Sequence, residues 1–80
     1  MAAVTVVSVY NNVDGSVRED TYVVNIAANG DTLTTSNSAI LSVEAFSVAA
    51  DAIGTTTAGG VVTFVTGGAE AGATVIVKGW

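Results

Sequence analysis

Short runs of valine and threonine, broken by glycine and asparagine, limit what this chain can fold into. Three such runs are "AVTVVSVY" (3–10), "VVTFVT" (61–66) and "ATVIVKGW" (73–80), and leucine occurs only twice in the sequence. Val and Thr lose side-chain freedom in helices and pack well on pleated sheets, whereas Gly, Asn and Asp form turns. The sequence therefore predicts an all-β fold.

Turn signals separate the predicted strands. Asp14-Gly15 follows the first run, and Asn29-Gly30 follows a further run, "TYVVNIAA" (21–28). Both dipeptides are typical of tight turns, because their residues tolerate positive φ. The glycine-rich "GGAEAG" (67–72) separates the last two runs and predicts a hairpin loop between them. In 21–28, only Asn25 is clearly polar on the face opposite Tyr22, which predicts a strand covered on both faces.

Segment 36–53 fits two different structures. At helical spacing, one side would carry Ile40, Val43, Ser47, Ala50 and Ile53. At a period of two, the serines, valines and phenylalanine in its middle fit a strand better. We favour a loop with one helical turn near Ser38 to Leu41, followed by a strand from about Val43 to Ala50.

The predicted strands number about five, and all of them are joined by short connections. Parallel neighbours need crossovers of about a dozen residues or more, so short links favour antiparallel pairing. With 80 residues, the chain has room for one core and one domain, residues 1–80. We therefore expect a small antiparallel β-sandwich or barrel.

The composition predicts a small core that benefits from assembly. Half of the residues are hydrophobic, but most of these are Val and Ala, and the sequence has no Cys or His. Small domains usually gain stability from disulfides, metals or association with partners. Disulfides cannot form without Cys, and the common soft metal ligands are missing. We therefore expect a homo-oligomer.

Charge and hydropathy narrow the classes of partner. The formal net charge is −5, with only two basic residues, Arg18 and Lys78. Affinity for nucleic acid rests largely on Lys and Arg that neutralise phosphates, so no nucleic-acid partner is expected. No apolar run approaches the about 20 residues of a membrane-spanning helix, and no secretory leader is recognised. We expect no membrane partner.

The sequence offers no catalytic, cofactor or metal site. Without His or Cys, an ordinary hydrolytic triad cannot be built. Glu19 and Asp20 are adjacent and would point to opposite faces of a strand, so they cannot act as a carboxylate pair. The other acidic side chains near turns or in the ambiguous segment are expected at the surface: Asp31, Glu44, Asp51 and Glu70. We expect no enzyme activity.

Aromatic residues are the remaining candidates for a functional surface. Tyr and Trp are enriched at protein interfaces, where a large rigid ring gives much contact at low entropic cost. We expect Phe46 and Phe64 in the core, and we expect Trp80, with Tyr10 and Tyr22 behind it, at an interface. The alternative is that all five aromatic rings fill the core. Trp80 shares a predicted strand face with Thr74, Ile76 and Lys78, and the lysine indicates that this face is not wholly interior.

The layout resembles the small capsid decoration, or cement, proteins of tailed bacteriophages. The resemblance lies in the opening "VTVVSVYNNVDGSVRE", a "G-x-x-L-T" element at Gly30 to Thr34, the stretch "AILSVEAFSV" and the closing "VVTFVTGGAEAGATVIVKGW". It covers nearly the whole chain and consists of patterns rather than chemistry.

The resemblance implies a non-enzymatic protein that binds the exterior of an assembled capsid, commonly as trimers, and braces it. Its partners would be the major capsid protein and copies of itself, and its location would be the virion, after assembly in the host cytoplasm. Two other functions fit the same residues. One is a structural subunit of the phage neck, tail or fibre base, and the other is a carbohydrate- or host-surface-binding β-module with Trp80 and Tyr22 as a stacking platform.

Overall fold

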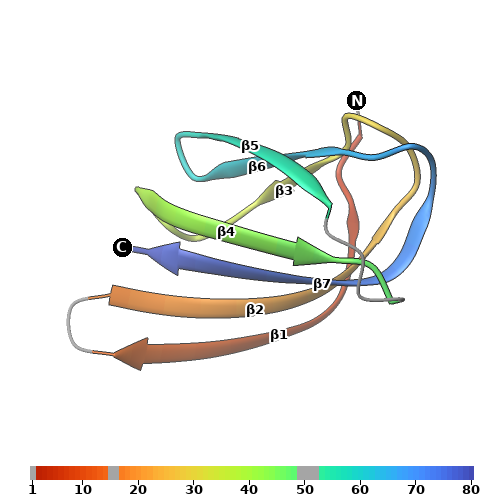
Figure 1. Ribbon diagram of the computed structural model, residues 1–80. Coiled ribbons are helices and arrows are strands. Elements are labelled where there is room, and N and C mark those ends of the chain that lie inside the picture. Colours follow the sequence, from red (N-terminus) through yellow and green to blue (C-terminus); the bar gives the residue numbers. More distant parts are fainter. Residues whose placement is uncertain (1, 15–16, 49–52) are drawn as a thin grey trace.

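Seven strands in two antiparallel sheets make up the fold, which confirms the all-β prediction (Figure 1). The computed structural model describes residues 2–14, 17–48 and 53–80, and these contain no helix. The strands are β1 (Thr5–Asp14), β2 (Val17–Ile26), β3 (Thr32–Thr34), β4 (Ile40–Phe46), β5 (Gly54–Ala58), β6 (Val61–Val65) and β7 (Glu70–Gly79).

The larger sheet has the strand order β1-β2-β7-β4. Tyr22 lies opposite Val75, and Val24 lies opposite Ala73, so the same face of both central strands is buried. The opposite face carries half-buried Val23 and exposed Asn25, so the prediction of a strand covered on both faces is wrong. Alternation of buried and exposed residues is what a sheet with one layer packed against it requires.

The smaller sheet has the strand order β3-β6-β5. Ala58 pairs with Val61, which leaves Gly59 and Gly60 as a two-residue turn with φ of 55° and 83°. Positive φ at both central residues is the requirement of a type I′ hairpin turn. The segment "GTTTAGG" is therefore a strand and a tight turn, although it has no apolar run that would reveal a strand.

The two sheets share one hydrophobic core. Phe64 and Val62 from the smaller sheet are fully buried, which confirms the prediction for Phe64. Phe46 differs from its prediction: it pairs with Thr74 on the outer face of the larger sheet and is only half-buried. The core comprises Val4, Tyr22, Val24, Ile26, Leu33, Ala45, Val62, Phe64, Ala73, Val75 and Val77.

The predicted hairpin between the last two strands does not form. β6 pairs with β3 and β5, whereas β7 lies between β2 and β4 in the other sheet. The loop between β6 and β7 is a corner that carries the chain from one sheet to the other. Asparagine side chains bind main-chain N–H groups at its start and in the first residues of β7. Asn29 Oδ1 accepts a hydrogen bond from Thr66 N at 3.0 Å, and Asn25 Oδ1 accepts one from Gly72 N at 2.9 Å.

The ambiguous segment contains a strand, but no helical turn at its start. β4 begins at Ile40, and Ala39 already exchanges two main-chain hydrogen bonds with Trp80, of 2.7 and 3.0 Å. This pairing extends the backbone where the turn was expected. The last part of the predicted strand, residues 49 and 50, lies outside the described residues. The count of about five strands was low because β3 and β5 are short and polar.

Both predicted turns separate strands, but the first joins two strands of one sheet and the second joins strands of different sheets. β1 and β2 form an antiparallel hairpin that ends in the pair Asp14–Val17, while Gly15 and Ser16 lie outside the described residues. At Asn29-Gly30, Gly30 has a φ of 90°, which confirms the turn. The chain then passes from β2 in one sheet to β3 in the other, so this turn is a corner rather than a hairpin.

Asp31 is buried at this corner and stabilises it by hydrogen bonds. The prediction of a surface position for Asp31 is therefore wrong. Its carboxylate is buried and accepts hydrogen bonds from Ala27 N at 3.0 Å, Ala28 N at 3.1 Å and Ala2 N at 3.4 Å. Its main-chain oxygen accepts a further bond from Phe64 N. Burial raises the pKa of the Asp31 carboxyl, but the main-chain donors together outweigh it and leave the pKa below its usual value.

We predict that Asp31→Asn lowers the free energy of unfolding at neutral pH. The free energy of unfolding of this variant should also change less between neutral and acidic pH than that of the wild type. A carboxyl whose pKa is lower in the folded state stabilises the fold above its usual pKa of about 4. That contribution is lost as the pH falls through the folded-state pKa. Urea unfolding at neutral and acidic pH measures both effects. Glu44→Gln, at an exposed strand position, is the control and should behave like the wild type.

We also predict that Gly60→Ala destabilises the protein more than Gly59→Ala. An alanine at either position adopts a left-handed conformation that costs about 1–2 kcal/mol. At Gly60 the new Cβ would in addition collide with the main-chain oxygen of Asn37, whereas nothing lies near it at Gly59. Overpacking of this kind adds about 1–3 kcal/mol. Equal loss in urea unfolding of the two variants would contradict this account.

Candidate interaction surface

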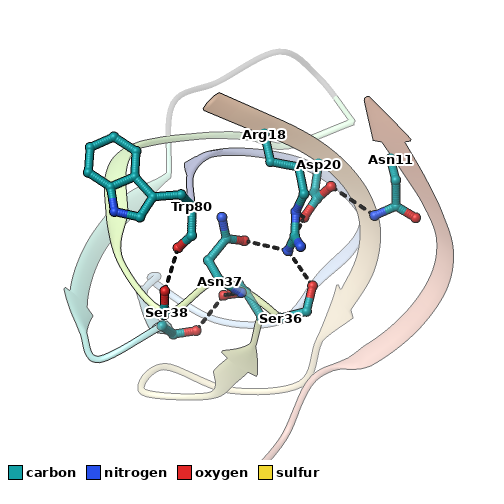
Figure 2. Close-up of polar contacts among 9 residues, drawn as sticks. Asn11, Arg18, Asp20, Ser36, Asn37, Ser38 and Trp80 are labelled. Atoms are coloured by element: carbon teal, nitrogen blue, oxygen red, sulfur yellow. Dashed lines mark hydrogen bonds and ion pairs between the residues drawn. The ribbon is translucent and has the colours of Figure 1, made fainter. Parts of the chain in front are cut away.

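Trp80 combines a fixed main chain with an exposed side chain. Its N–H donates to the Ala39 oxygen, and its main-chain oxygen accepts from Ala39 N at 2.7 Å and from the Ser38 hydroxyl at 2.9 Å. Nevertheless, 55% of the residue is exposed. Figure 2 shows the indole directed away from the polar residues around Arg18. The strand end thus presents a large apolar ring at a defined place on the surface.

Gly79 makes this anchoring possible. A Cβ at this position would collide with the main-chain oxygen of Ala39, so only glycine lets the start of β4 approach the end of β7 so closely. Gly79 pairs with Arg18 of β2 on one side and with Ile40 of β4 on the other. The residues before it behave as predicted: Thr74, Ile76 and Lys78 share the outer, half-buried face of β7.

Tyr10 is the second predicted interface residue at the surface. It is 67% exposed and lies on β1, the outermost strand of the larger sheet, opposite Thr21. Thr21 in turn pairs with Ile76, four residues before Trp80. At about 3.3 Å per residue, the two rings are therefore separated by about 13 Å along the strands. They belong to two separate parts of the surface.

Tyr22, the third predicted interface residue, lies in the core. It is only 6% exposed, because it faces the smaller sheet from β2. Burial, followed by the nearby charge of Asp20, raises the pKa of the Tyr22 hydroxyl above its ordinary value, although Arg18 and hydrogen bonding to Ser36 act in the opposite direction. Tyr22 is thus not available to a partner, and a stacking platform of Trp80 with Tyr22 does not exist at this surface.

Sequence reasoning missed a buried polar cluster at one end of the larger sheet (Figure 2). Asp20 is completely buried and accepts hydrogen bonds from Asn11 Nδ2 at 2.8 Å and from Arg18 Nε at 3.1 Å. A terminal nitrogen of Arg18 lies 3.0 Å from the same carboxylate. A buried carboxylate needs such partners, because removing an unpaired charge from water is costly.

Arg18 also links this cluster to the loop between β3 and β4. Its Nη2 group donates to the Ser36 hydroxyl and, at 3.2 Å, to Asn37 Oδ1. Asn37 is buried, and its Nδ2 atom has no hydrogen-bond partner among the described residues. The cluster therefore joins β1, β2 and the loop after β3 by polar contacts and not by apolar packing.

The remaining chemistry among the described residues is sparse. Glu19 and Asp20 do point to opposite faces: Asp20 is buried, and Glu19 faces Lys78 on the outside at 3.6 Å. Within the described part of the chain, no three acidic residues lie close enough to share a metal ion, and no pocket is found. None of the described segments is a helix of the length and hydropathy that crossing a membrane requires. Asp51 lies outside the described residues.

We predict that Asp20→Ala costs far more stability than Glu19→Ala, its neighbour in sequence. The first variant leaves Arg18 and Asn11 without their buried acceptor, and breaking such a pair costs about 3–5 kcal/mol when both partners are buried. Because Arg18 is partly exposed, we expect about 2–3 kcal/mol after solvent screening. The Glu19–Lys78 pair is exposed, so its loss should cost at most about 1 kcal/mol. Urea unfolding of the two variants tests the difference, and similar values would show that the cluster contributes little.

Exposed apolar side chains are thus the surface feature from which a function can be inferred. Besides Tyr10 and Trp80, these are Val6, Val7, Val9, Leu41, Val48 and Val65. Of these eight residues, four lie on β1, where exposed apolar side chains occur on both faces of the sheet. Comparison with known proteins adds no further candidate: no family model, no curated protein and no solved structure matches this chain.

Proposed function

We propose that this protein is a capsid decoration protein that binds the exterior of an assembled phage shell and braces it. The observation that carries the proposal is the exposed indole of Trp80 on a main chain held by three hydrogen bonds. A residue whose main chain is already fixed loses less further freedom when a partner covers its ring, so more of the contact energy contributes to binding. The resemblance described above supplies the kind of partner, the major capsid protein.

The size of the core supports a function in assembly. Among the described residues, eleven buried apolar side chains form the core, and seven of them are valine or alanine. A standard interface buries about 800 Å² on each partner. That area is nearly a fifth of the 4370 Å² surface of this chain. Association would therefore add a large share to the apolar area that the chain removes from water.

The arrangement of the sheets fits this function. We take the two sheets around their shared core as a small, open β-sandwich, with β1 and the outer face of the larger sheet left uncovered. An uncovered face with half-buried Val23, Phe46 and Ile76 is suited to lie against another protein. In this proposal the copies act as a homo-oligomer on the virion surface, and no chemistry is required of them.

Purified particles test the proposal directly. We expect the chain to copurify with phage heads at a copy number close to that of the major capsid protein. Absence from virions would overturn the proposal. A low copy number confined to the neck, tail or fibre base would replace it with a structural function there.

We predict that Trp80→Ala weakens binding to heads with little change in folding. The indole is 55% exposed, so truncating it removes mainly the contact with the partner. Residues of this kind at interface centres contribute about 2 kcal/mol or more, which corresponds to a loss of affinity of about thirtyfold or more. Val65→Ala is the matched control, because Val65 is equally exposed but lies on the smaller sheet. Cosedimentation with heads lacking the protein gives affinity, and thermal unfolding gives stability. An equal loss of both in Trp80→Ala would contradict the prediction.

A further inference from the structure

Among the residues that the structure describes, β1 is an edge strand with no partner on its outer side. It spans ten residues and pairs only with β2. Residues Ser8 to Asp14 form a regular ladder with β2, because the shift in register lies between Val6 and Ser8. Figure 1 shows β1 at the side of the larger sheet farthest from β5. The main-chain groups on this free side form a ready template for another strand.

The other edges of the described sheets are occupied or face each other. At β3, Thr32 exchanges hydrogen bonds with the segment before β1: Thr32 N donates to the Ala2 oxygen, and Val4 N donates to the Thr32 oxygen. The edges of β4 and β5 approach each other at the end of β4, where Ile53 N donates to the Ala45 oxygen (Figure 1). With ten residues, β1 is longer than β4 with seven or β5 with five, so it is the longest edge that a neighbouring copy offers.

From Ser8 to Val13, β1 lacks the devices that keep edge strands apart. Lysine, proline and inward-pointing charges are absent from the stretch 5–13, and the register shift of β1 lies before Ser8. The whole chain carries a net charge of −5, so two copies repel each other over most of their surfaces. Residues 8–13 carry no charge, so two acidic copies can approach closely along them.

We propose that two copies of this chain pair through β1, antiparallel and about a twofold axis. The two four-stranded sheets then become one continuous sheet of eight strands. The same residues meet on both sides of such an axis, so each copy satisfies the free main-chain groups of the other.

The exposed side chains of β1 fit this pairing. Val9 pairs with Tyr22, so it lies on the inner face of the sheet, yet 46% of it is exposed because the smaller sheet does not reach it. Tyr10 lies on the outer face. A second β1 alongside would cover apolar side chains on both faces at once, and cross-strand pairs of this kind stabilise sheets. This inference concerns the isolated protein and does not depend on the capsid.

Sedimentation of the full chain at several concentrations tests the proposal. We expect a mass of twice the 7.9 kDa of one chain, which falls to that of one chain on dilution. Tyr10→Lys/Asn12→Lys should halve the mass at high concentration, because like charges then meet across the twofold axis. Both positions are exposed, and Asn12 lies opposite Glu19, so the isolated fold should tolerate the change. Val65→Lys/Thr57→Lys adds the same charge at exposed positions of the smaller sheet and should retain the doubled mass.

Hydrogen exchange of the unmodified protein gives a test that needs no variant. Those amides of Ser8 to Asp14 that point away from β2 should exchange more slowly at high than at low concentration, while the amides of β6 should not change. A single-chain mass at every concentration would overturn the proposal, as would a mass of three chains. Unchanged exchange in β1 within a two-chain species would place the contact elsewhere and would overturn it as well.

Discussion

The pairing of β7 with β2 is the interaction on which the rest of this structure depends. These two strands are the centre of the larger sheet, and their inner faces supply five of the fully or almost fully buried core side chains: Val24, Ile26, Ala73, Val75 and Val77. β4 can join the sheet only because β7 is in place, and the smaller sheet packs on the face that the pair creates. Two strands far apart in sequence must therefore meet before the core exists, and such non-local contacts are typical of slowly folding β-proteins.

Buried carboxylates stabilise the two places where apolar packing ends. Asp31 binds main-chain donors at the corner from β2 to β3, and Asp20 binds Arg18 and Asn11 at the far end of the same strand. With a core made mostly of Val and Ala, such polar contacts fix positions that small side chains leave loosely specified. Because the pKa of the Asp31 carboxyl is held below its usual value, the stability of the fold depends on pH through this group.

Much of the fold follows from the sequence, but its topology does not. Runs of Val and Thr predict β2, β6 and β7, and Asn29-Gly30 marks a turn. The outer face of β7 was predicted through Lys78, whereas β2 was wrongly expected to be covered on both faces. β3 and β5 were missed because Thr-rich segments of only three and five residues carry no periodic signal, although Gly59-Gly60 is a hairpin signal in its own right. The closing hairpin was assigned wrongly because a loop of this length can either reverse a strand or carry it to the other sheet.

At the candidate surface, Trp80 and Tyr10 are exposed as expected. Tyr22 was not distinguishable from them, because a buried and an exposed tyrosine differ only in the face on which they lie.

The exposed apolar side chains of the larger sheet have two physical origins. The smaller sheet has three strands and the larger has four, so inner-face Val6 and Val9 on β1 stay uncovered. Tyr10 and Trp80 lie on the outer face, over which no second layer packs among the described residues. Cover supplied by another molecule would couple stability to assembly, as the proposed function on a capsid requires.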